Sequence, residues 1–229
     1  MTLFAQSSYL DRDVEDWHFE TWAWLMGAFG GVRQLKWGPL ITPDPQFFPP
    51  TSATGHERAQ HIFSCIRGRM GAADFDCVLL DSEARQADAL SDGKVVIIYT
   101  LDGDPMTTVS EMAHGMAAEM VNRQPQRPPG GDDLFWPACS LAVAYKGFGI
   151  FGANAALEAD SFGRSVTRKE TGYLSELTWS LALATYLALT DRQGQAAGWL
   201  DSMMEPLVHD AERYLRKHPD RLAPLLAID

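Results

Sequence analysis

Residues 109–121, Val-Ser-Glu-Met-Ala-His-Gly-Met-Ala-Ala-Glu-Met-Val, place His114 where a zinc-binding H-E-x-x-H helix would have its first histidine. In that motif two histidines one helical turn apart bind one zinc ion, and the glutamate after the first histidine acts as general base. Here Gly115 stands at the glutamate position and Ala118 at the position of the second histidine. Neither side chain has a lone pair, so His114 alone is left to bind a metal.

Substitute ligands would define an altered metal site or enzyme. Glu111 lies three residues before His114 and therefore on the same helix face. The remaining ligands would have to come from later in the chain, although nothing in their spacing favours this: Cys139, Asp132 or Asp133. Glu111 also ends a Thr-Val-Ser-Glu capping box at 108–111, which explains it without a metal.

The plain alternative is a buried helix over 105–121. Asp104 and Pro105 are favoured at a helix start, and Met112, Met116 and Met120 follow at helical spacing. Methionine fills irregular core space, and a glycine inside a helix costs about 1 kcal/mol relative to alanine. Gly115 therefore indicates close packing by a neighbour, or a site vacated by a larger residue.

The pattern of apolar residues predicts the elements that must position this helix. Helices are expected over 12–30, where His18 reads as a half-buried packing residue, and over 54–70. Strands are expected at 35–42, 75–81 and 93–102. Beyond residue 134 the chain reads as mainly helical, with one long helix at 135–157, another at 172–189 and one or two more within 195–219.

These elements predict a mixed α+β fold. A small N-terminal α/β sheet part, residues 35–102, would pack on a mainly helical part, residues 104–229, within a single domain 1–229. The helix 105–121 would lie at their junction.

The composition limits the kinds of partner and the cellular compartment that we expect for this protein. The net charge is −11, and no basic run exceeds the pair Arg168–Lys169, so a phosphate-binding face for nucleic acid or an anionic membrane is not expected. Three widely spaced cysteines, Cys65, Cys77 and Cys139, form no C-x-x-C pair. With neither a basic leader nor an apolar stretch of membrane-spanning length, we expect a cytoplasmic protein.

Four short motifs occur in an order that resembles a bacterial family of gluzincin-type zinc metallopeptidases. They are Pro-Asp-Pro-Gln-Phe-Phe at 43–48, Ala-His-Gly-Met-Ala-Ala at 113–118, Gly-Phe-Gly-Ile-Phe-Gly-Ala-Asn at 147–154 and Gly-Tyr-Leu-Ser at 172–175. In that family an A-H-E-L-G-H helix is followed by a glutamate ligand and a T-D-L element. The resemblance spans 15–218 and implies a zincin-like fold.

The departures from the family all fall on its metal chemistry. His114 matches the first ligand, whereas the third-ligand glutamate would fall near Trp136. The T-D-L aspartate would fall near Ser140, with Cys139 in place of the threonine, and no glutamate lies between residues 120 and 157. The resemblance therefore implies a degenerate relative that has lost its metal and uses no other cofactor.

We accordingly expect a pseudoenzyme, a metallopeptidase-like protein that acts by binding an unidentified protein, peptide or small ligand. The vestigial cleft would be lined by seven residues: Glu111, His114, Gly115, Ala118, Trp136, Cys139 and Ser140. Two alternatives stay open, the altered enzyme or metal site described above and a structural protein whose apolar helices form a homo-oligomer.

Overall fold

The structure, a computed structural model, describes residues 8–82, 94–100, 104–161 and 174–229. Its helices and strands are α1 (Arg12–Phe29), α2 (Val32–Trp37), α3 (Gly55–Met70), β1 (Cys77–Asp81), β2 (Val95–Tyr99), α4 (Pro105–Asn122), α5 (Phe135–Val143), α6 (Gly149–Ser161), α8 (Glu176–Leu189), α9 (Met204–Lys217) and α10 (Pro219–Leu226). A π-helical turn, Ala144–Phe148, joins α5 to α6.

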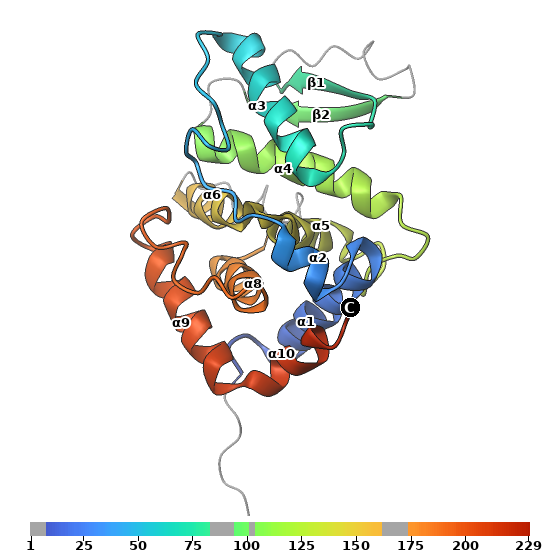
Figure 1. The fold of residues 1–229 in the computed structure, drawn as a ribbon, viewed down its shortest axis with the longest axis vertical. Helices are drawn as coiled ribbons and strands as arrows, with labels where there is room; N and C mark the ends of the chain where they lie inside the picture. The colour runs from blue at the N-terminus through green and yellow to red at the C-terminus, as the bar shows by residue number, and fades with distance from the viewer. Residues whose placement is uncertain (1–7, 83–93, 101–103, 162–173) are drawn as a thin grey trace, which may run out of the picture.

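Helix α4 crosses the molecule between two groups of elements (Figure 1). α3 and the two strands lie on one side of it, and α5, α6 and the remaining helices lie on the other. β1 and β2 pair in parallel, with Cys77 opposite Val95 and Asp81 opposite Tyr99. The predicted α+β class is confirmed as a helix-rich fold with a small two-stranded sheet in the described part of the chain.

The start of α4 follows from its sequence. The Asp104 carboxylate accepts hydrogen bonds from Met106 N at 2.7 Å and Thr107 N at 3.2 Å, and Pro105 occupies the first turn. Thr108 therefore lies inside the helix, where its side chain cannot cap the first turn. The predicted capping box at 108–111 is wrong, because Asp104 already supplies the cap.

The predicted long helix over 135–157 is broken at Gly147. This residue has φ 86°, and a side chain there would overlap the backbone oxygen of Pro39. Only glycine adopts this conformation without strain, and the chain at Pro39 can therefore pass against the π-helical turn. Ile41 N donates a hydrogen bond to Gly147 O at 2.9 Å.

The predicted strand at 35–42 is also wrong. Its first residues belong to α2, which buries Leu35, and Gly38 ends that helix. Residues 38–42 form no strand but run along the π-helical turn, with Leu40 and Ile41 buried. Leu35, Leu40 and Ile41 are buried against helices and not against a sheet partner.

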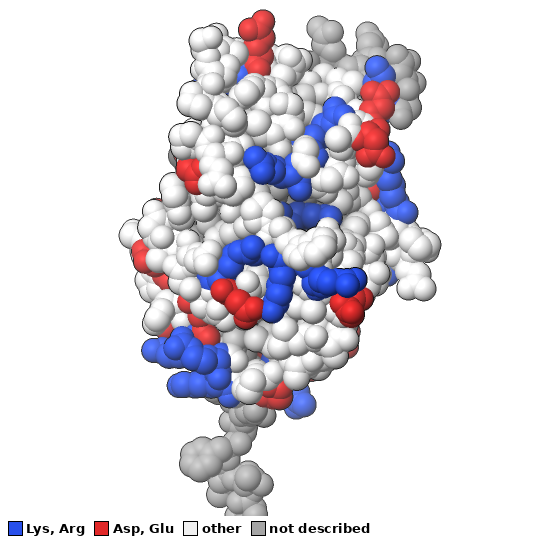
Figure 2. Space-filling view, viewed as in Figure 1, with Lys and Arg blue, Asp and Glu red and all other residues white. Residues whose placement is uncertain are grey.

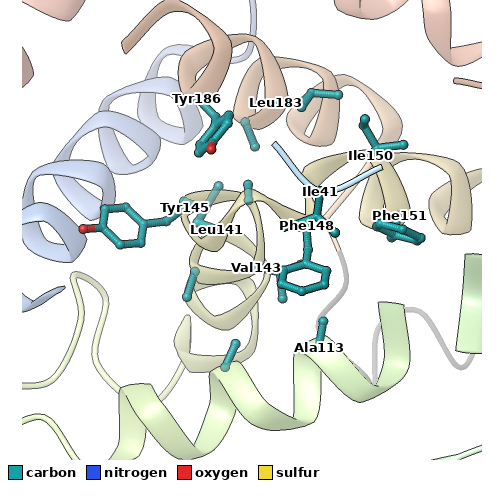
Figure 3. Packing of buried hydrophobic residues seen from close by; sticks show 14 of the residues in the cluster. Ile41, Ala113, Leu141, Val143, Tyr145, Phe148, Ile150, Phe151, Leu183 and Tyr186 are labelled. Atoms are coloured by element: carbon teal, nitrogen blue, oxygen red, sulfur yellow. The ribbon is translucent and has the colours of Figure 1, made fainter. Parts of the chain in front are cut away.

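The buried side chains form a core that includes residues from both sides of α4. Figure 3 shows the part around the π-helical turn, where the Phe148 ring points toward Ala113 of α4 and Tyr186 comes from α8. His18 on α1 is fully buried in this core, not half-buried as predicted. Its helix packs directly against the helical part, and burial lowers the pKa of His18 to about 3.

Lys and Arg side chains gather over the middle of the face shown in Figure 2, beside acidic side chains. On α2, Lys36 pairs with Asp191 at 2.6 Å and Arg33 with Asp229 at 3.8 Å. Among the described helices, none has the length and apolar composition needed to cross a membrane.

Candidate functional site

Helix α4 carries His114 on a deeply buried face. Its neighbours Met112, Ala113 and Met116 are fully buried, and His114 itself is 6% exposed. Burial lowers the pKa of His114 to about 4, although its hydrogen bond to the Trp136 carbonyl acts in the opposite direction. The imidazole is therefore neutral at pH 7.

Helix α5 supplies the partners of this imidazole. His114 Nε2 lies 3.1 Å from Ser140 Oγ and 3.4 Å from the backbone oxygen of Trp136. The Trp136 indole stacks on the imidazole, with ring centroids 5.8 Å apart and planes 21° from parallel. The structure thus brings together three of the predicted cleft residues, His114, Trp136 and Ser140.

The hydrogen bonds assign the proton on His114. A backbone carbonyl can only accept, so the bond to Trp136 O places a hydrogen on Nε2. Nε2–H then also points to Ser140 Oγ, while the Ser140 hydroxyl is 3.4 Å from the same carbonyl. Nε2 acts as a donor in this arrangement, and the lone pair of the neutral imidazole is then on Nδ1.

Gly115 and Ala118 follow His114 along α4. A Cβ built on Gly115 would lie 3.2 Å from Cδ1 of Ile97, so the glycine lets β2 pack closely against the helix. Ala118, one turn after His114, is half-buried and contributes a methyl group. Close packing by a neighbour therefore explains Gly115, as the sequence suggested.

Glu111 is held by the end of β2 through Thr100. Its carboxylate accepts hydrogen bonds from Thr100 N at 2.9 Å and from Thr100 Oγ1 at 3.3 Å. Thr108 Oγ1 in turn donates to Thr100 O at 3.3 Å. These contacts give Glu111 a structural role, joining the sheet to α4.

The other candidate ligands lie apart from this arrangement. Cys139 is fully buried, and burial raises the pKa of its thiol to about 12. Asp132 and Asp133 are exposed in the loop before α5, where Asp132 pairs with Arg127 at 3.3 Å. Within the described ranges, no three His, Cys, Asp or Glu side chains gather in a way that could hold a metal ion.

The residues around His114 do not fit a zinc ion. The Trp136 indole, the Ser140 hydroxyl, Gly115 and the Ala118 methyl group offer none of the imidazole, thiolate or carboxylate ligands that zinc takes in proteins. Compared with protein-family models, with curated proteins and with solved structures, the chain has no match.

A pocket of about 370 Å³ was not predicted from the sequence. Two of its lining residues, Leu134 and Pro137, flank Trp136 in the chain. The others come from α1, from the first turn of α8 and from the two residues before α8, Leu174 and Ser175. Segments so far apart in sequence leave no local motif, so periodicity could not reveal this pocket.

Proposed function

We propose that this chain is a catalytically inactive, zincin-like protein that acts by binding a protein, peptide or small ligand. The observation that carries the proposal is the packing of Trp136 on His114. The resemblance makes His114 the first zinc ligand and places a glutamate ligand near Trp136. An indole at that point fills space beside the imidazole and offers no electron pair to a metal.

The electrostatics of the site support binding over catalysis. A general acid or base works best when its pKa is near the pH of the reaction. The pKa of His114 is about 4 and that of Cys139 about 12, so neither group is suited to proton transfer at pH 7. Trp136 is 47% exposed, which leaves an aromatic surface for a ligand.

Metal analysis tests the absence of a metal site. Protein purified without added zinc should contain transition metals well below one ion per chain. A stoichiometric metal that disappears in His114→Ala would overturn the proposal, because it would show that His114 still holds an ion.

Rebuilding the ligand set tests the zincin-like framework. The double variant Ala118→His with Trp136→Glu supplies the second imidazole and the carboxylate that the resemblance implies. We expect it to bind Co²⁺ with the visible absorption of a tetrahedral site, whereas Ala118→His alone should not. A folded double variant without Co²⁺ binding would contradict the zincin-like geometry.

A homo-oligomer is the second candidate, favoured by strongly exposed apolar side chains. Trp37 is 78% exposed and Met203 is 67% exposed. A contiguous exposed apolar patch often marks an interface, and these two side chains would contribute to one. Light scattering over a range of concentrations decides the matter, since a strict monomer would count against this candidate.

A further inference from the structure

The first turns of α1 and α8 meet the start of α5 around the pocket of about 370 Å³. Its walls are mainly apolar and are formed by Val14, Trp17, Leu134, Pro137 and Leu174, with Thr178 beside them. Such a wall favours an apolar side chain as the bound group.

Apolar side chains at the pocket are open to solvent. Val14, which lines it, is 41% exposed, and Leu177, next to the lining residue Thr178 in the first turn of α8, is 45% exposed. Soluble proteins rarely leave neighbouring large apolar side chains open without a partner. This exposure indicates an occupant longer than one side chain.

Among the residues that the structure describes, the charged side chain that lines the pocket is acidic. Asp13 lines it, Asp11 precedes α1, and Asp133 precedes Leu134, all three exposed. The arginines nearest to them in the chain are already paired: Arg12 with Asp16 at 3.9 Å and Arg127 with Asp132 at 3.3 Å. A partner with Lys or Arg beside its apolar side chain would complement this charge.

The N-termini of α1, α5 and α8 around the pocket do not favour an anion as the ligand. The Asp11 side chain accepts a hydrogen bond from Asp13 N, and the Ser175 side chain accepts one from Thr178 N. Pro137 in the first turn of α5 has no N–H to donate. The same acidic charge disfavours an anionic lipid surface, and it disfavours this face meeting itself in a symmetric dimer.

We propose that this pocket binds a segment of another protein in which an apolar side chain is flanked by lysine or arginine. The inference rests on the proposed binding function and names the chemistry of the partner. Val14 and Leu177 contact the apolar part, and Asp13 with its acidic neighbours attracts the flanking cations.

A fluorescein-labelled peptide with a central Leu-Phe pair and two lysines on each side is the probe. Fluorescence polarisation with the full chain should give saturable binding that weakens as salt is raised. Two companion peptides, one with glutamate for lysine and one with serine for Leu-Phe, should bind at least about ten-fold more weakly. Equal binding of all three, or no saturable binding of the probe, would overturn the proposal.

Substitutions of exposed residues test whether the probe binds at this pocket. Leu177→Glu, Val14→Glu and Asp13→Lys change exposed side chains at the pocket, and each should weaken the probe by about ten-fold or more. The matched control is Leu226→Glu, because Leu226 on α10 is 47% exposed and does not line the pocket. Unchanged affinity in all three pocket variants would refute the assignment. So would a wild-type dimer that Leu177→Glu dissociates, since the occupant would then be a second copy.

The outcomes separate this inference from the proposed function. Stoichiometric zinc on His114 with intact probe binding would refute the proposed pseudoenzyme but support peptide binding at the pocket. A metal-free protein that does not bind the probe would refute peptide binding at the pocket but leave the proposed pseudoenzyme standing.

Discussion

The imidazole of His114 lies almost parallel to the indole of Trp136, with the ring centroids 5.8 Å apart. The tryptophan is 47% exposed and the histidine 6% exposed, so the outer ring shields the inner one from water. This contact between α4 and α5 contributes to the burial that lowers the pKa of His114. The protonation of His114 can therefore be followed through its effect on the stability of the fold.

Acidification should destabilise the fold through His114. The pKa of this group is about 4 in the folded protein and 6.5 in its ordinary state. Between these values the unfolded chain binds a proton and the folded chain does not, so the free energy of unfolding falls as the pH falls. From pH 7 to pH 5 this one group should account for about 2 kcal/mol.

The measurement is urea unfolding of the wild type and of His114→Gln at both pH values. The variant should lose about 2 kcal/mol less than the wild type on acidification. His18 contributes in the same direction in both proteins, because its pKa is lowered to about 3, and it cancels in the comparison. His209→Gln on the exposed face of α9 is the matched control. An identical pH dependence in wild type and His114→Gln would show that His114 is not held neutral.

Cys139 should resist alkylation in the folded protein. Its side chain is fully buried, and its pKa is raised to about 12, so almost no thiolate is present at pH 8. Iodoacetamide followed by mass spectrometry should leave Cys139 unmodified and should modify the half-buried Cys65 first. In urea all cysteines should react. Rapid modification of Cys139 in the native protein would favour the alternative of an altered enzyme.

Local signals predict the main helices of this fold closely. α1, α3 and α4 end within one residue of their predicted limits, because apolar spacing and terminal residues such as Asp104 agree. The break at Gly147 is not predictable in this way, since an apolar run reads equally well as a continuous helix. Its positive φ depends on Pro39, which is distant in sequence and reaches Gly147 only in the folded chain.

The candidate site, like the fold, could be predicted only in part from local sequence signals. Periodicity alone marks His114 as a core residue, and the ordered motifs are what single out Trp136 and Ser140. The structure places both beside His114, while the use of this group as a binding cleft stays a prediction. The hydrogen bonds of Glu111 could not be predicted from the sequence, because its partner Thr100 belongs to a different segment, at the end of β2.

Removing Arg221 should destabilise the contact between α1 and the C-terminal helices. The fully buried carboxylate of Glu15 pairs with Arg221 at 3.0 Å and accepts a hydrogen bond from Tyr214 OH at 2.7 Å. Arg221→Ala would leave a buried negative charge without its cation. Because Arg221 is 31% exposed, the expected loss is about 2 kcal/mol, below the 3–5 kcal/mol typical of a fully buried pair.

Arg213→Ala is the matched control for this ion pair. Arg213 pairs with Asp210 at 2.9 Å, but both side chains are half-exposed. Solvent screening limits such a pair, so the change should stay within about 0.5 kcal/mol. Equal losses in the two variants, measured by urea unfolding, would contradict the special role of Glu15.

A methyl group should have opposite effects at two glycines. Gly147 has φ 86°, and its added Cβ would overlap the Pro39 oxygen, so Gly147→Ala should cost about 2 kcal/mol or more. Gly27 lies in α1 with nothing within 4 Å of a new Cβ, so Gly27→Ala should gain about 0.5–1 kcal/mol from helix propensity. Thermal unfolding of both variants decides between the two effects. A stable Gly147→Ala would mean that Pro39 does not pass against the π-helical turn. The interruption between α5 and α6 would then need another cause.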